Sequence, residues 1–154
     1  MQEMGSMREP LEVMKGLIGD WDVDATIALT DGSSLEGSGT WTVREVSLGK
    51  GVHTVLRLQA GGRPMEENDL WGYDPGDHKL HMLSVTSDGN VHDHSGSVDQ
   101  DNVLHLRWEG VVDNEPAHEH ISIEVYSPDE VKVLSVEHIG EREQARMEMV
   151  LRLR

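Results

Sequence analysis

The sequence predicts an all-β fold, a closed up-and-down antiparallel barrel of about ten strands with a short helix at its start. Two observations support this class. Turn-forming residues recur at short, regular intervals along the chain, and the segments between them alternate apolar with polar residues. No connection is long enough for a helical crossover, so a parallel sheet is excluded.

The turn signals define the hairpins. Each of them contains Gly, Pro, Asn or Asp, which supply a positive φ, a preset φ or a local side-chain hydrogen bond. Examples are Asp31-Gly32, Asp74-Pro75-Gly76, Asp88-Gly89 and Asp113-Asn114. Consecutive hairpins of this kind build a meander, and closing a long meander removes its exposed edges.

The alternation within the strands predicts one buried and one exposed face. In the first strand, Trp21, Val23 and Ala25 share a face opposite to Asp22 and Asp24. Side chains at i and i+2 of a strand lie on the same side, so each strand can bury one face and leave the other in water.

A helix is expected over residues 9–18, with Pro10 in its first turn and Gly19 ending it. Leu11, Met14, Leu17 and Ile18 form its apolar stripe. Residues 1–154 are expected to form a single lipocalin-like domain, in which residues 1–8 are a flexible N-terminal tail.

Composition excludes several functions. Lys and Arg total 13 against 29 Asp and Glu, a net charge of −16. Such a field repels phosphate backbones and anionic lipids, so we expect neither nucleic acid nor membrane as a partner. The chain has no Cys, which excludes disulfides and thiolate sites. Because no signal-like or membrane-spanning apolar run is present, we expect a cytoplasmic protein.

Three short motifs resemble a known family. They are Gly19-Asp20-Trp21 after the helix, Gly37-Ser38-Gly39-Thr40-Trp41, and Trp71-Gly72-Tyr73-Asp74-Pro75. The first resembles the opening of lipocalins and other calycin barrels. Together the motifs resemble a lipocalin-like family of prokaryotic proteins without an assigned function, similar in plan to nitrobindin-like haem-binding barrels.

The resemblance covers residues 9–154 and implies that Trp21 closes one end of the barrel. It also makes haem a candidate ligand. The strand number departs from that of true lipocalins, and no single histidine matches the haem ligand of nitrobindin-like proteins. The family supplies no catalytic residue to carry over.

Nine histidines are many for this length, and four of them suggest a metal site. His92 and His94 are two residues apart and share a face. If Asp88-Gly89 is a two-residue loop, Val85 lies opposite His92, and His81 joins the same face. A second two-residue loop at Gln100-Asp101 adds His105. The predicted ligands of a transition metal such as Zn, Cu, Ni or Fe(II) are therefore His81, His92, His94 and His105.

A plainer interpretation competes with the metal site. The face of the strand opposite His105 carries Leu104, Leu106 and Trp108, which are better core residues. On this register the four histidines therefore lie outside the barrel, where histidines are usually solvated. His118 and His120 are expected to point outward, and so are Glu124 and Glu137.

A barrel of about ten strands can enclose a cavity. The predicted ligand-binding residues are Trp21, Met82, His138, Met147 and Met149, since methionines adapt to varied apolar ligands. Ordinary core packing is the alternative interpretation of the methionines, and a hydrogen-bonded core histidine is that of His138.

Three functions remain open at this point. The first is binding of a small apolar or amphipathic molecule, haem among the candidates, in the lumen. The second is a metal-dependent enzyme or metal binder that uses the histidine cluster. The third is a non-catalytic interaction or structural protein, with a homodimer as a candidate assembly. Because no motif of a nucleophile elbow, phosphate loop or zinc protease is present, we expect a binder rather than an enzyme.

Overall fold

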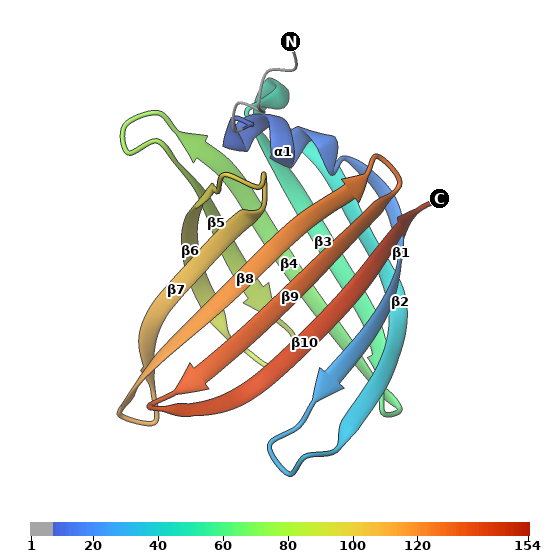
Figure 1. Cartoon of the computed structure of the whole chain (residues 1–154), viewed down its shortest axis with the longest axis vertical. Helices are drawn as coiled ribbons and strands as arrows, with labels where there is room; N and C mark the ends of the chain where they lie inside the picture. Colours follow the sequence, from blue (N-terminus) through green and yellow to red (C-terminus); the bar gives the residue numbers. More distant parts are fainter. Residues whose placement is uncertain (1–7) are drawn as a thin grey trace.

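The computed structural model describes residues 8–154, and ten antiparallel strands in these residues form one closed barrel (Figure 1). Each strand pairs with its neighbours in the chain, and β1 pairs with β10 to close the sheet. The predicted fold class is confirmed. The strands are β1 (Gly19–Ala28), β2 (Ser34–Val46), β3 (Gly51–Ala60), β4 (Arg63–Asp74), β5 (Lys79–Thr86), β6 (Val91–Val98), β7 (Leu104–Val112), β8 (Glu115–Ser127), β9 (Glu130–Ile139) and β10 (Arg142–Leu153).

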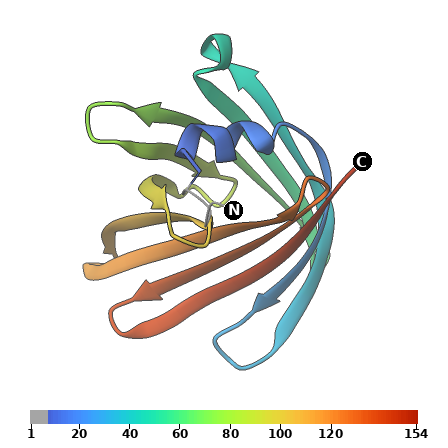
Figure 2. The ribbon, with the colours of Figure 1, turned by 45° about the horizontal axis from the view of Figure 1, so that its top comes forward.

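Among residues 8–154 there is one α-helix, α1 (Pro10–Gly16), which lies across one end of the barrel (Figure 2). It is shorter than the predicted range of 9–18, because the chain leaves the helix at Leu17 and turns into β1 through Gly19, whose φ is +147°. Its buried side chains are Val13 and Met14, followed by Leu17, whereas Ile18 is 38% exposed. No helix within residues 8–154 is long and apolar enough to cross a membrane. The predicted tail lies outside the described residues, apart from Arg8.

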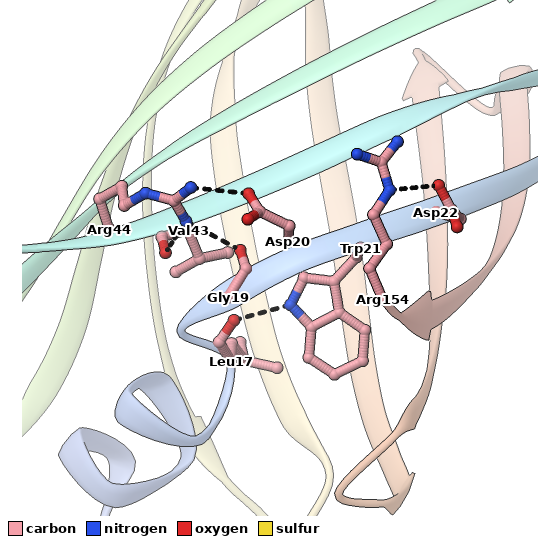
Figure 3. Close-up of polar contacts among 8 residues, drawn as sticks. All are labelled: Leu17, Gly19, Asp20, Trp21, Asp22, Val43, Arg44 and Arg154. Carbon is pink, nitrogen blue, oxygen red and sulfur yellow. Dashed lines mark hydrogen bonds and ion pairs between the residues drawn. The ribbon is translucent and has the colours of Figure 1, made fainter.

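Trp21 joins the helix to the barrel. Its ring is buried, and its indole N–H donates a hydrogen bond of 2.8 Å to the carbonyl of Leu17 (Figure 3). Burial of a tryptophan with its one donor satisfied stabilises the end of the helix against β1. Trp21 thus has the position at the closed end that the family resemblance implies.

Two ion pairs lie on the outer surface near this end (Figure 3). Arg44 contacts Asp20 at 2.7 Å, and Arg154 contacts Asp22 at 2.7 Å. All four side chains are about half exposed or more. Exposed pairs of this kind contribute little to stability, so the burial of α1 dominates at the closed end.

Close strand packing in β2 depends on a glycine. A Cβ at Gly39 would lie 1.8 Å from the carbonyl oxygen of Arg57 on β3, so no larger residue fits there. Pairing with both neighbours continues without a shift through Gly39. Register shifts do occur between Val125 and Ser127 and between Glu143 and Ala145.

The contribution of α1 to stability can be measured with a matched pair of variants. We expect Leu17→Ala to lower the free energy of unfolding by about 2–5 kcal/mol, because it leaves a cavity under the helix. Ile18→Ala removes a partly exposed side chain and is expected to cost less than about 1 kcal/mol. Urea denaturation followed by tryptophan fluorescence gives both values. Equal losses in the two variants would contradict the role of α1 as a packed plug.

Candidate functional site

The lumen contains an inner cavity of about 60 Å³. One part of its lining is apolar and aromatic, and the other part is acidic. No Lys or Arg belongs to the lining that residues 8–154 provide. The lining residues are Trp41, Leu56, Glu67, Asp69, Trp71, Met82, Leu106, Glu119, Ile121, Ile123, Val133, Ser135, Met147 and Met149.

A wider mouth of about 460 Å³ leads from this cavity to solvent at the end opposite to α1, the lower end in Figure 1. The mouth and the inner cavity share Leu56, Glu67 and Met147. Arg63 and Asp88 lie at the mouth, near the hairpin loops of this end. A small molecule can therefore reach the cavity from the open end, while α1 closes the other.

The β5–β6 hairpin turns His92 and His94 into the lumen. Ser84, and not Val85, lies opposite His92, and Met82 lies opposite His94. The predicted register was wrong because the loop holds one more residue than a two-residue turn, with Gly89 at φ +92° in a position that favours glycine. A change of one residue in register moves every side chain to the other face.

The β6–β7 hairpin shows the same difference. Ser97 lies opposite His105, and Asn102 has the positive φ, +62°. His105 therefore lies on the outer surface, where its ring nitrogens contact Asp99 at 2.7 Å and His120 at 2.8 Å.

His81 also lies on the outer surface, with its Nε2 2.7 Å from Asp77. The structure thus divides the four predicted metal ligands. His92 and His94 come together inside the barrel, and His81 and His105 lie outside it and apart from them.

Inside the lumen, Glu119 of β8 completes a group with the two histidines. The His94 Nε2 atom hydrogen-bonds to Glu119 Oε1, and His92 Nδ1 lies 3.9 Å from the same oxygen. The His92 ring stacks on Trp108, with 3.6 Å between ring centroids. Sequence reasoning missed Glu119, although its alternation with the inward-facing Ile121 and Ile123 was a usable signal.

A buried hydrogen-bond chain lies on the neighbouring strands. The Trp71 indole N–H donates to Thr54 Oγ1 at 3.2 Å, and the Thr54 hydroxyl donates to Asp69 Oδ2 at 2.8 Å. Three buried side-chain atoms have no hydrogen-bond partner within residues 8–154. Asp69 Oδ1 and His94 Nδ1 belong to inward-facing side chains, and His138 Nδ1 lies on the outer face. We call the inward-facing group formed by Glu67, Asp69, His92, His94, Glu119 and Glu137 the polar wall.

Burial shifts the protonation of the polar wall. It raises the pKa of Glu67 well above the ordinary range, and the charges of Asp69 and Glu119 add to the effect. Burial also raises the pKa of Asp69, against the hydrogen bonds from Thr54 and Ser84. Burial lowers the pKa of His92, and the nearby Glu119 opposes that change. These groups are therefore held closer to neutrality than the same groups on the surface.

Glu137, which was expected to face outward, also belongs to the wall. It lies opposite Glu119 on the lumen side of β9, and burial raises its pKa, with a further contribution from the charge of Glu119. Glu124 is exposed, as expected.

The predicted ligand-binding residues have different locations. Met82, Met147 and Met149 line the inner cavity, and Trp21 lies at the closed end. His138 lies on the outer face, stacked on His118 with 4.7 Å between centroids, so its expected lumenal orientation was wrong. Its strand has apolar residues on both faces, since Leu134 and Val136 are half-buried outside, and alternation alone did not identify the inner one.

Comparison with known proteins identifies the fold but not the family. The chain matches no family model and no curated protein. Among solved structures, the S-type phycobiliprotein lyase CPES from Guillardia theta has a TM-score of 0.71 at 11% identity, over 96% of this chain and 93% of that one. Rv2717c from M. tuberculosis has a TM-score of 0.72 at 16% identity, over 97% and 99% of the two chains.

Designed barrels give weaker similarity. A de novo designed fluorescence-activating β-barrel has a TM-score of 0.51 at 17% identity, over 92% of this chain and 97% of that one. The identities are low, so these matches support the fold alone. They support a closed antiparallel β-barrel.

The raised pKa of Glu67 predicts a pH-dependent contribution to stability. Between its unfolded value of 4.5 and its higher folded value, the folded state retains a proton that the unfolded state has lost. Stability from this group is therefore present below the unfolded pKa and is lost as pH rises through the folded pKa. We expect Glu67→Gln, which does not titrate, to become progressively more stable relative to the wild type from pH 5 to pH 8.

Urea denaturation at several pH values measures this difference. Glu109→Gln, on the exposed outer face of β7, is the matched control and should show no such trend. A difference between Glu67→Gln and the wild type that stays constant with pH would contradict the assignment.

Proposed function

We propose that the barrel binds a compact amphipathic molecule in its lumen, with an apolar body and a positively charged head. The observation that carries this proposal is the mixed apolar and acidic lining of the inner cavity. Tryptophan and methionine side chains form one part, and Glu67, Asp69 and Glu119 form the other. Ligand sites in proteins commonly combine apolar walls with a few convergent polar groups.

The apolar side suits a flexible or aromatic body. Trp41 and Trp71 lie with ring centroids 6.5 Å apart, and Met82, Met147 and Met149 complete this part of the lining. Methionine side chains adjust their shape to a guest and make favourable contacts with aromatic rings. The cavity can therefore accept more than one apolar shape.

The acidic side favours a cationic head over an anionic one. Three carboxyl groups line the cavity, and the chain as a whole has a net charge of −16. Burial raises the pKa of Glu67 and of Asp69, and a cation bound beside these carboxyl groups favours their charged form, whereas an anion disfavours it. An ammonium group also supplies the hydrogen-bond donors that carboxylates accept.

The inner cavity by itself is too small to enclose a haem. It has about 60 Å³, whereas pockets that enclose drug-sized ligands have about 300–1,000 Å³. The proposed ligand is therefore smaller than haem, with its head at the polar wall and its body extending toward the mouth.

The structural neighbours support binding of a guest by this kind of barrel. The protein EF1p2_mFAP2b was solved bound to DFHBI, and it has a TM-score of 0.52 to this chain at 16% identity, over 97% of this chain and all of that one. From this similarity we take only one element of the proposal, namely that the binding site of this chain is the lumen. Membership of a lipocalin-like family related in plan to nitrobindin-like barrels is likewise a proposal.

Three probes of equal chain length test the proposal, namely hexylamine, 1-hexanol and hexanoate. We expect isothermal titration calorimetry at pH 7.5, with EDTA present, to give a Kd for hexylamine at least about tenfold lower than for hexanoate, and hexanol in between. Equal affinity for the amine and the acid would contradict the role of the carboxyl groups.

A cavity-filling variant tests the location. Met147→Trp adds volume at the junction of the inner cavity and the mouth and is expected to abolish hexylamine binding. Leu83→Trp on the outer face of β5, where Leu83 is 46% exposed, is the matched control and should bind as the wild type does. Unchanged binding by Met147→Trp would show that the probe binds elsewhere.

A further inference from the structure

Three side chains of the polar wall form a compact group of metal-ligand type. His92 and His94 come from β6 and Glu119 from β8, and β7 lies between these two strands. One ligand atom of each residue lies within 4.8 Å of those of the other two. The group is therefore assembled by the closed sheet from segments that are 25 residues apart in sequence.

We propose that His92, His94 and Glu119 bind one divalent transition-metal ion, with Zn²⁺ as the best fit, inside the lumen. Imidazole nitrogens and a carboxylate oxygen are ligands that Zn²⁺ and Fe²⁺ accept. Two atoms bound to a tetrahedral Zn²⁺ stand about 3.4 Å apart. The distance from His92 Nδ1 to Glu119 Oε1 is 3.9 Å, and the His94–Glu119 contact is closer, so small side-chain rotations give the required spacing.

The burial of the group favours a specific site over a solvated cluster. The His94 side chain is fully buried, and those of His92 and Glu119 are 10% and 15% exposed. The stack of His92 on Trp108 holds its ring in one orientation. A site whose ligands are held by packing loses little side-chain freedom when the metal binds.

Two unpartnered atoms give independent support. His94 Nδ1 and Asp69 Oδ1 are buried without a hydrogen-bond partner within residues 8–154. Buried polar atoms are almost always satisfied, and exceptions often indicate an ion or ordered water. A metal on His94 Nε2 fixes the ring proton on Nδ1, and metal-bound histidines usually donate that proton to a carboxylate or carbonyl. Asp69 Oδ1 is a carboxylate acceptor in the same wall, and it is not hydrogen-bonded to His94 Nδ1 in this structure.

The surrounding charges also favour a cation. Glu119 lies opposite Glu137, and Glu67 and Asp69 complete the group of carboxyls. Like charges that face each other across two strands are unfavourable. A divalent ion offsets this repulsion, and three protein ligands leave at least one coordination position for water.

The outer clusters lack these features. Asp74, Asp77 and His81 also bring ligand atoms within 4.8 Å of one another, but all three residues are exposed, with His81 at 47%. Exposed acidic groups of this kind are common without a metal. The contrast makes the outer histidines suitable controls.

Metal titration of the protein stripped with EDTA tests this site without any organic guest. We expect calorimetry to show one equivalent of Zn²⁺ bound. Co²⁺ is expected to give the visible absorption bands of a site with nitrogen and oxygen ligands. His94→Gln and Glu119→Gln should each weaken Zn²⁺ binding at least about 100-fold. The double variant His81→Ala with His105→Ala should bind as the wild type does.

A folding control keeps the test decisive. Zn²⁺ should raise the Tm of the wild type and of the outer double variant, because it binds the folded state. It should leave the Tm of Glu119→Gln unchanged while the far-UV circular dichroism of that variant remains that of a barrel. Absence of stoichiometric binding by the wild type, or loss of binding in the outer double variant alone, would overturn the proposal. Since hexylamine binding is measured with EDTA, the two proposals can fail separately.

Discussion

The pairing of β1 with β10 is the constraint on which the other features depend. It runs from Trp21 opposite Leu153 to Ala28 opposite Arg146 and joins the two ends of the sheet. Closure gives every strand an inner and an outer face, and alternation then assigns each residue to one of them. The lumen, its closure by α1 and its access from the far end all follow from that assignment.

Most of the inner surface is ordinary core, and the polar wall is the exception. Burying carboxyl groups and imidazoles is costly unless they find partners. Some of that cost is offset here, by the Trp71–Thr54–Asp69 chain, the His94–Glu119 hydrogen bond and the stack of His92 on Trp108. The unpartnered Asp69 Oδ1 lies on a residue that lines the inner cavity. Departures from local stability rules are expected at functional sites, and this one motivates the proposed binding site.

The architecture could be predicted from the sequence because its signals are local. Turn residues and alternation gave ten strands, and Pro10 and Gly19 bounded the helix within a few residues. These features depend on the backbone preferences of single residues and on period-two patterns, which a sequence displays directly. The position of Trp21 at the closed end was expected only from the resemblance of Gly19-Asp20-Trp21 to the opening of lipocalins.

The site could be predicted only in part, because it depends on register. Asp88-Gly89 is typical of a two-residue turn, yet the hairpin uses a longer loop with Gly89 in the left-handed region, and Asn102 has the same role in the next hairpin. This difference of one residue brings His92 and His94 inside. Alternation with the outward-facing His118 and His120 could have placed Glu119 on the inner face. Its contact with His92 and His94 could not be predicted in this way, because they lie on a strand that is not its neighbour.

The polar wall and the proposed metal site both require that His92 and His94 point into the lumen. Chemical footprinting measures this direction. Diethyl pyrocarbonate modifies accessible imidazoles, and mass spectrometry of the peptides gives the rate for each histidine. His94 is 1% exposed and His92 is 9% exposed, whereas the His81 side chain is 47% exposed. If His92 and His94 face the lumen, we expect rapid modification of His81 and slow modification of His92 and His94 in the folded protein. After unfolding, we expect equal rates for all three. Modification of His92 and His94 as fast as that of His81 in the folded protein would contradict the inward-facing polar wall.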